Sequence, residues 1–226
     1  MGILGALLRG AIRREPAGGR SAPVALELPA LAADLPAARA ALSDAYARYV
    51  ATVSAADMAV SLETASFLLA LCRRLRPARV LDLGSGFSSV VFRAYAGTAD
   101  PRCLVHTVDD DEAWLERTGA FLAREGLAAD GLFAWSRFEG ASDSGYAVVL
   151  HDLGRMPRRA ATVEFAVSRR APDGVLVLDD MHKAHYAPHA EAVCARANLR
   201  VLSLRGYTLD RFGRFACLAV PAAPEG

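Results

Sequence analysis

The feature that most constrains this chain is the stretch RVLDLGSGFSS, in which an apolar run containing Asp82 breaks into glycine, serine and glycine at residues 84–86. A continuous run of Val and Leu is typical of a strand that is buried on both faces of a sheet. Glycines let the backbone turn tightly and approach a ligand closely. The free amides at the start of a following helix favour anionic or strongly polar groups. The stretch therefore predicts a strand, a ligand-binding loop and a helix, in that order.

Strand-like and helix-like patterns alternate along the rest of the chain. The strand-like runs lie at residues 79–83, 103–108, 132–136, 146–150 and 174–178. The helical patterns between and after them lie at residues 87–97, 111–126 and 158–170, and around Pro188. Such alternation predicts a mainly parallel sheet with helices on both faces. Two last strand-like runs, RVLSLRGY and RFACLAV, are joined only by TLDRFG, which is too short for a crossover helix, so they are predicted to be antiparallel.

Two helices are expected before the first strand. Asp34 with Pro36 two places later is a helix-start signal. Ser61 can cap a second helix over LETASFLLALCRRL, which Pro77 ends.

Composition excludes several kinds of protein. Hydrophobic residues make up 53% of the 226 residues and charged residues 23%, which excludes a mostly disordered chain. The formal net charge of +1 gives no basic field, so no nucleic-acid partner is expected. The four cysteines form no CxxC pair, and we expect them to be buried free thiols of a cytoplasmic protein.

Residues 1–22 are interpreted as an amphipathic segment followed by a linker. Its apolar run ILGALL is too short to span a membrane and lacks the charged start and cleavage site of a secretory peptide. Apolar residues at 3, 4, 7, 8, 11 and 12 fall on one helical face. A helix of this kind packs on its own protein, on a second subunit in a homodimer, or on a membrane surface through residues 1–14. The sequence leaves these alternatives open.

From Val60 to Val220 the chain resembles class I S-adenosylmethionine (SAM)-dependent methyltransferases. The resemblance is carried by VLDLGSGFSS, HTVDDD and the final RVLSLRGYTLDRFGRFACLAV. MAVSLETASFLLAL is similar to the segment before the glycine loop in catechol and caffeoyl-CoA O-methyltransferases, and APDGVLVLDDMH also resembles macrocin-type sugar O-methyltransferases. The resemblance implies an α/β, Rossmann-like fold with a mainly parallel seven-stranded sheet and an antiparallel C-terminal hairpin. It divides the chain after the N-terminal segment into a helical lid, residues 23–76, and a catalytic domain, residues 77–226.

The resemblance also implies which residues bind SAM. The amino-acid end of SAM is expected to face Asp82, Gly84, Ser85 and Gly86. Asp109, at the end of the second strand, is placed to accept hydrogen bonds from both ribose hydroxyls, as an acidic residue does in dinucleotide-binding folds.

Three further residues are expected to complete the SAM site, and each part of the site has a purely structural alternative. Asp110 lies near the expected adenine edge, and Ser61 and Glu63 are expected to close the pocket over the methionine tail. The alternative for the loop is a plain strand-to-helix turn, and for residues 109–111 it is helix capping.

Ser88 stands at the third position of the glycine loop and is also expected to contribute to the SAM site. Dinucleotide-binding folds use a glycine there for close helix packing, whereas methyltransferases often do without it. A nicotinamide-dependent oxidoreductase is therefore the less favoured alternative.

Three aspartates end the fourth and fifth strands. Asp152 ends the fourth, and Asp179 and Asp180 end the fifth, so their side chains are expected at one rim of the sheet. Converging carboxylates repel one another unless protons or a cation compensate. Oxygen ligands suit Mg²⁺, and the matching positions of the resembled O-methyltransferases bind such a metal. We therefore expect Mg²⁺ at Asp152, Asp179 and Asp180, with helix capping or contact with SAM alone as the alternative.

The general base is less clearly marked. Catechol-type enzymes carry a lysine base at the place of Arg155, and a guanidinium is always protonated and cannot act as a base. His182 is the favoured base, with Asp152 as the second catalytic residue, while Lys183 and His151 are weaker candidates. A zinc site at His182, His185 and His189, on a shared helical face, is disfavoured because Pro188 would interrupt the helix.

Together with these residues, the resemblance implies an enzyme that methylates a small hydroxylated acceptor on oxygen with SAM, assisted by a divalent metal. A non-catalytic SAM-binding protein is the further alternative, because the lysine base is replaced by Arg155.

Overall fold

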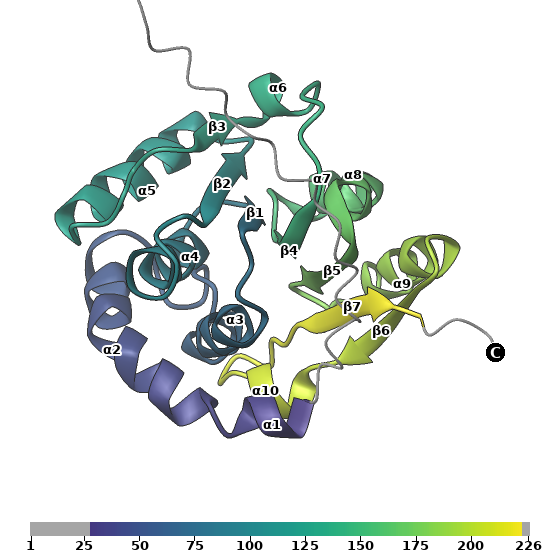
Figure 1. Cartoon of the computed structure of the whole chain (residues 1–226), viewed down its shortest axis with the longest axis horizontal. Coiled ribbons are helices and arrows are strands. Elements are labelled where there is room, and N and C mark those ends of the chain that lie inside the picture. Colours follow the sequence, from purple (N-terminus) through teal and green to yellow (C-terminus); the bar gives the residue numbers. More distant parts are fainter. Residues whose placement is uncertain (1–27, 223–226) are drawn as a thin grey trace, which may run out of the picture.

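A seven-stranded sheet runs through the centre of the molecule in the order β3-β2-β1-β4-β5-β7-β6 (Figure 1). The computed structural model describes residues 28–222. The strands are β1 (Arg79–Leu83), β2 (Leu104–Asp109), β3 (Leu132–Ala134), β4 (Tyr146–His151), β5 (Arg170–Leu178), β6 (Leu199–Ser203) and β7 (Cys217–Pro221). Strands β1 to β5 are parallel, and β7 is antiparallel to both β5 and β6. The predicted sheet, with its antiparallel C-terminal pair, is confirmed.

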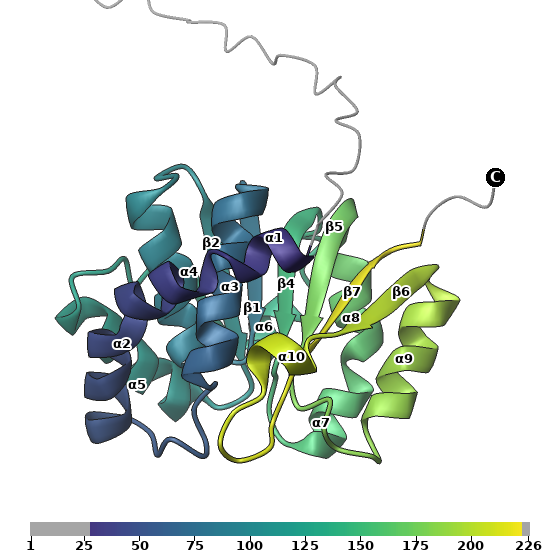
Figure 2. The ribbon, with the colours of Figure 1, turned by 90° about the horizontal axis from the view of Figure 1, so that it is seen from below.

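Helices cover both faces of this sheet (Figures 1 and 2). One face carries α1 (Leu28–Ala32), α2 (Leu35–Thr52), α3 (Leu62–Leu75), α4 (Phe87–Thr98), α5 (Glu112–Arg124) and α10 (Arg205–Thr208). The other carries α6 (Trp135–Phe138), α7 (Met156–Ala161), α8 (Val163–Arg169) and α9 (Ala187–Arg196). Figure 2 shows α10 next to α3, which it contacts.

The central strands divide their side chains between two hydrophobic cores. Val80, Val148 and Val177 point into the core under α3 and α4, and their neighbours Leu81 and Val149 point into the core on the opposite face. This alternation follows from the two-residue period of a strand. Because both faces are buried, these strands are continuous apolar runs in the sequence.

Helices α2 and α3 begin where the sequence predicts, whereas the short α1 before them was not predicted. Asp34 is the N-cap of α2 with a proline in its first turn, and the Ser61 hydroxyl accepts a hydrogen bond from the Thr64 amide at the start of α3 (3.0 Å). Phe67 and Leu68 of α3 are fully buried against the same core as α4. The division at residue 76 between lid and catalytic domain stays a prediction, and the segment 1–22 lies outside the described residues.

Four local predictions are wrong at their boundaries. The third strand ends at Ala134, because Trp135 starts α6 and packs on Phe165. The pattern over residues 158–170 forms two helices that part at Thr162, whose hydroxyl lies 2.9 Å from His151 Nε2. The predicted strand RVLSLRGY stops at Ser203, where α10 soon follows, and the strand expected over RFACLAV begins only at Cys217.

The expectation that Pro188 interrupts a helix is also wrong. Pro188 lies in the first turn of α9, where a missing amide costs no hydrogen bond. His182 and His185 precede α9, so they share no helical face with His189. Within residues 28–222, no helix is both long and apolar enough to cross a membrane.

Candidate functional site

A cavity of about 1180 Å³ opens at the carboxyl ends of the central strands. Its walls come from the loops after β1, β2, β4 and β5 and from residues 57–60 between α2 and α3. In open α/β sheets this crevice is where ligands bind. Of the predicted site residues, it brings together Gly84, Ser85, Asp109, Asp110, Asp152, Asp179, Asp180 and His182.

The glycine loop is pressed against the end of β4. Gly84 has φ +106°, a conformation that L side chains rarely adopt, and its amide donates to Val108 O (2.8 Å). A Cβ at Gly84 would also collide with the backbone carbonyl of Asp152. The loop therefore needs glycine here both for its backbone angle and for space.

Asp109 points at this loop from the end of β2. The amide and the hydroxyl of Ser85 both donate to Asp109 Oδ2 (2.6 and 2.8 Å), and the amide of Asp111 donates to Oδ1 (3.0 Å). Only 5% of Asp109 is exposed, and burial raises the pKa of its carboxyl. Asp109 thus places hydrogen-bond acceptors beside bare backbone at the wall of the cavity.

Trp114 is a cavity residue that the sequence analysis missed. Its indole Nε1 donates to Ser85 O (2.7 Å), which holds the ring beside the glycine loop. Its amide donates to Asp111 Oδ1 (3.1 Å), so Asp111 caps α5 while Asp109 remains at the cavity. The signal that could have identified Trp114 is an aromatic residue in the first helical turn after an acidic strand end.

Asp82 lies beneath the glycine loop and outside the cavity lining. Its Oδ2 accepts hydrogen bonds from Ser89 Oγ (2.6 Å) and Thr107 Oγ1 (3.0 Å), and the amide of Gly86 donates to Ser89 Oγ (3.2 Å). Asp82 is fully buried, which raises the pKa of its carboxyl to about 6. Asp82 therefore supports the loop through Ser89 and does not face the cavity directly, and Gly86 and Ser88 are likewise absent from the lining.

Ser61 and Glu63 are also placed away from the cavity. The Ser61 side chain caps α3, and Glu63 forms an ion pair with Arg39 (2.9 Å). The part of this region that does line the cavity is the loop at residues 57–60.

The three aspartates at the ends of β4 and β5 converge as predicted, but a buried arginine lies among them. Arg159 Nη1 is 2.6 Å from Asp152 Oδ1 and 2.5 Å from Asp180 Oδ2. Burial raises the pKa of Asp152 and Asp179, and the Arg159 charge opposes this rise for both. Sequence reasoning missed Arg159, because one arginine in an arginine-rich helical pattern carries no distinguishing signal.

The predicted Mg²⁺ site is not supported by this arrangement. Among residues 28–222, no group of three or more His, Cys, Asp or Glu side chains is arranged to hold a metal ion. The space between Asp152 and Asp180 is already bridged by the guanidinium of Arg159. The residues present therefore do not fit a metal ion.

His182 is the imidazole that faces the cavity. Its Nδ1 is 3.6 Å from Asp180 Oδ1, and Lys183 Nζ is 2.8 Å from Asp180 Oδ2. His151 is instead fully buried between Tyr186 and Thr162, and burial lowers its pKa to about 3. His151 therefore stays neutral and has no access to a ligand.

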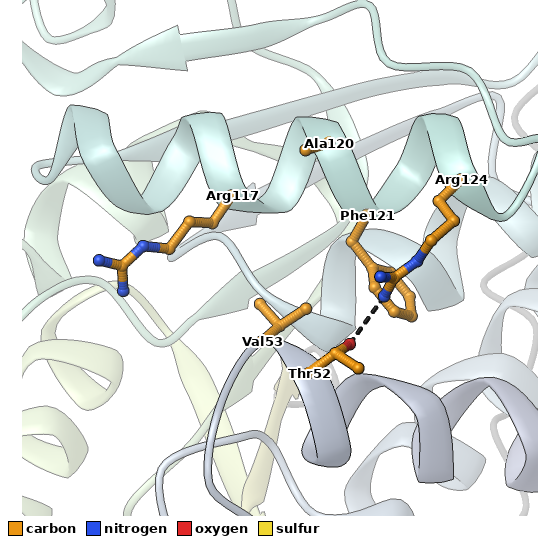
Figure 3. Close-up of a pocket in the computed structure, with 6 residues that line it drawn as sticks. All are labelled: Thr52, Val53, Arg117, Ala120, Phe121 and Arg124. Carbon is orange, nitrogen blue, oxygen red and sulfur yellow. Dashed lines mark hydrogen bonds between the residues drawn. The ribbon is translucent and has the colours of Figure 1, made fainter.

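A second, smaller hollow of about 420 Å³ lies between the end of α2 and α5 (Figure 3). Arg124 donates to Thr52 Oγ1 across it (2.7 Å), and Arg117 points away from this bond. It contains none of the predicted site residues.

No protein-family model matches the chain, and no curated protein sequence matches it significantly. Solved structures do share its fold. The O-methyltransferase TomG of Streptomyces achromogenes, which acts in tomaymycin synthesis and was solved with SAM, is 17% identical over 82% of this chain and 90% of its own, with a TM-score of 0.59. A methyltransferase of Podospora anserina bound to S-adenosylhomocysteine (SAH) is 15% identical over 81% and 88%, with a TM-score of 0.59.

An O-methyltransferase of Bacillus cereus in complex with SAH is 15% identical over 87% of this chain and 93% of its own, with a TM-score of 0.54. The chain thus has the Rossmann-like fold of the class I methyltransferases.

Proposed function

We propose that this protein is a SAM-dependent methyltransferase that methylates a small hydroxylated acceptor on oxygen. The observation that carries the proposal is the position of Asp109, whose carboxylate lies against Ser85 of the glycine loop at the wall of a large cavity. A carboxylate accepts two hydrogen bonds at once, which suits the two hydroxyls of a ribose. The structures with the same fold that were solved with SAM or SAH support this choice of cofactor.

The adenosyl group would lie between Asp109 and the loops around it. Ser85 Oγ now donates to Asp109 Oδ2, and a ribose hydroxyl would take over this bond. Trp114 and Asp110 line the same part of the cavity, so they would flank the base. Residues 57–60 would cover the acceptor as part of the proposed lid, residues 23–76.

The chemistry requires little covalent participation by the protein. SAM supplies a sulfonium methyl group that is already electrophilic, so the protein must align the acceptor oxygen and remove its proton. His182 faces the cavity with Nδ1 toward Asp180, which leaves Nε2 to accept that proton. The carboxylate of Asp180 would stabilise the imidazolium that forms. Two of the structures compared above are named as O-methyltransferases, which supports an oxygen acceptor.

The test is formation of SAH from SAM with a panel of phenols, catechols and sugars. We expect His182→Ala to lower kcat by about 10²-fold or more, because a general base contributes about 10²–10⁴-fold. Asp109→Ala should instead raise the KM for SAM at least about tenfold, since charge-assisted hydrogen bonds are lost.

His185→Ala is the matched control, because His185 is exposed and does not line the cavity. The His185→Ala variant should leave kcat and the KM for SAM unchanged. Loss of activity in His185→Ala but not in His182→Ala would contradict the assignment of the base. Failure of every acceptor, with intact SAH binding, would favour a non-catalytic SAM-binding protein.

A further inference from the structure

The carboxylate cluster of the cavity contains its own cation. Besides its two ion pairs, Arg159 donates through Nη2 to the backbone carbonyls of Asp152 (2.8 Å) and Gly154 (2.9 Å). Its side chain is 8% exposed, against 24% for Asp152 and 13% for Asp180. The guanidinium is therefore held by both a carboxylate pair and two carbonyls, in a position that solvent hardly reaches.

We propose that Arg159 is the resident cation of this cluster and takes the place that a divalent metal would occupy, so that methyl transfer in this protein is independent of metal. A guanidinium is never deprotonated in proteins, and its several N–H donors let Arg159 contact two carboxylates through Nη1 and two carbonyls through Nη2. It supplies a permanent positive charge that needs no ligand exchange. The proposal deepens the function proposed above, but its main test does not depend on that function.

Charge and distance both oppose a metal at this place. Mg²⁺ requires oxygens at about 2.0–2.1 Å in near-octahedral geometry. Such a cation would have to share Asp152 Oδ1 and Asp180 Oδ2 with the positively charged Arg159 nitrogen, which already contacts both at 2.6 and 2.5 Å. Lys183 adds a second positive charge at Asp180 (2.8 Å), so the two carboxylates that Arg159 bridges are already neutralised by two cations.

Arg159 is also a positioning residue for the proposed base. Asp180 has φ +58°, a strained value for a non-glycine residue, and its Oδ2 is held by Arg159 and Lys183. Its other oxygen, Oδ1, is the one that faces His182 Nδ1. Arg159 thus orients the carboxylate that would stabilise a protonated His182.

The experiment is titration of the full chain with Mn²⁺, monitored by electron paramagnetic resonance of the free ion. We expect wild type and Arg159→Lys, which keeps a positive charge, to bind no stoichiometric Mn²⁺. Arg159→Ala should gain one stoichiometric Mn²⁺ site, at least about tenfold tighter than any weak binding by wild type, because the carboxylates lose their compensating charge. The double variant Arg159→Ala/Asp180→Asn should lose this site again. Once a methyl acceptor has been identified, EDTA should leave the methyl-transfer rate of wild type unchanged.

Two results would overturn the proposal. One is stoichiometric Mn²⁺ binding by wild type that Asp180→Asn abolishes. This measurement tests the proposal even if the Arg159→Ala variant does not fold. The other is an Arg159→Ala variant that retains the wild-type circular dichroism and binds no Mn²⁺. SAH binding is measured on the same samples. A protein that binds SAH but gives either of these Mn²⁺ results would overturn only the role of Arg159, whereas a protein that binds no SAH would contradict the methyltransferase assignment.

Discussion

A single buried carboxyl, Asp82, makes the strand before the glycine loop sensitive to pH. Asp82 is fully buried and its pKa is raised to about 6, mainly by desolvation, which the hydroxyls of Ser89 and Thr107 only partly offset. An unfolded aspartate loses its proton near pH 4. The folded protein therefore holds a proton between about pH 4 and 6 that the unfolded chain has already released. Stability contributed by this group is present below pH 4 and is lost as pH rises through 6.

We predict that Asp82→Asn reduces this pH dependence. A shift of about two pKa units corresponds to about 3 kcal/mol, so Asp82 by itself should lower the free energy of unfolding by up to that amount between pH 4 and 7. In Asp82→Asn this contribution should be absent. The contributions of Asp109, Asp152 and Asp179, whose pKa values are also raised, should remain, as should the opposite contribution of His151, whose pKa is lowered. Urea unfolding at several pH values measures this. Asp173→Asn, at an exposed site, should behave as wild type, and an unaltered slope in Asp82→Asn would refute the prediction.

At the scale of elements, one arginine joins two segments that are far apart in the chain. Arg214 lies before β7 and donates to the carbonyls of Asp57 (2.6 Å) and Ala56 (3.0 Å) between α2 and α3. Its Nε also donates to Asp210 Oδ2 (2.7 Å), and the Asp210 side chain is only 3% exposed. Both Arg214 and Asp57 line the cavity, so this contact fixes one wall of the site.

We predict that Arg214→Ala loosens both segments together. Breaking a largely buried ion pair costs about 3 kcal/mol, because the remaining charge stays desolvated. Hydrogen exchange measured by mass spectrometry should speed up at residues 54–60 and 209–216, and not in β1. The control is Arg211→Ala in the same loop, because Arg211 stacks on Phe212 and forms no ion pair among the described residues. Faster exchange in only one of the two segments would contradict the coupling.

For the whole molecule, a ligand in the large cavity should stabilise the fold globally. The cavity wall is built from the loops after four strands and from the loop between α2 and α3, so occupation tightens segments on both faces of the sheet. A ligand at about 100 times its Kd stabilises the folded state by about 2.7 kcal/mol. For a chain of this size, each kcal/mol raises Tm by about 2–4 °C.

We therefore predict that saturating SAH raises Tm by about 5–10 °C in differential scanning calorimetry. NADH at the same concentration should cause no shift, because the loop lacks the third glycine that dinucleotide-binding folds use. A shift with NADH and none with SAH would favour an oxidoreductase over the methyltransferase proposed above.

The sequence alone determined the sheet, the glycine loop and the place of Asp109. Strands buried on both faces produce continuous apolar runs, so the strands can be located in the sequence. Parallel strands bring their carboxyl ends to one rim, so the residues that end them can be placed on that rim. The convergence of the three aspartates on that rim followed from the same reasoning. The helix start at Ser61 was predictable because its hydroxyl caps the helix through a residue only three places along, and the start at Asp34 because Pro36 is favoured in the first turn of a helix.

Only the tertiary structure decided what neutralises those aspartates. Arg159 differs from its neighbour Arg158 in α7 by its partners: Arg159 reaches Asp152 and Asp180, which follow β4 and β5, whereas Arg158 reaches Asp110, which follows β2. The same limit applies to Ser61 and Glu63, whose side chains cap α3 and bind Arg39 instead of reaching the cavity. Local pattern specifies which element a residue belongs to, whereas a bridge between side chains of different elements depends on packing across the whole fold.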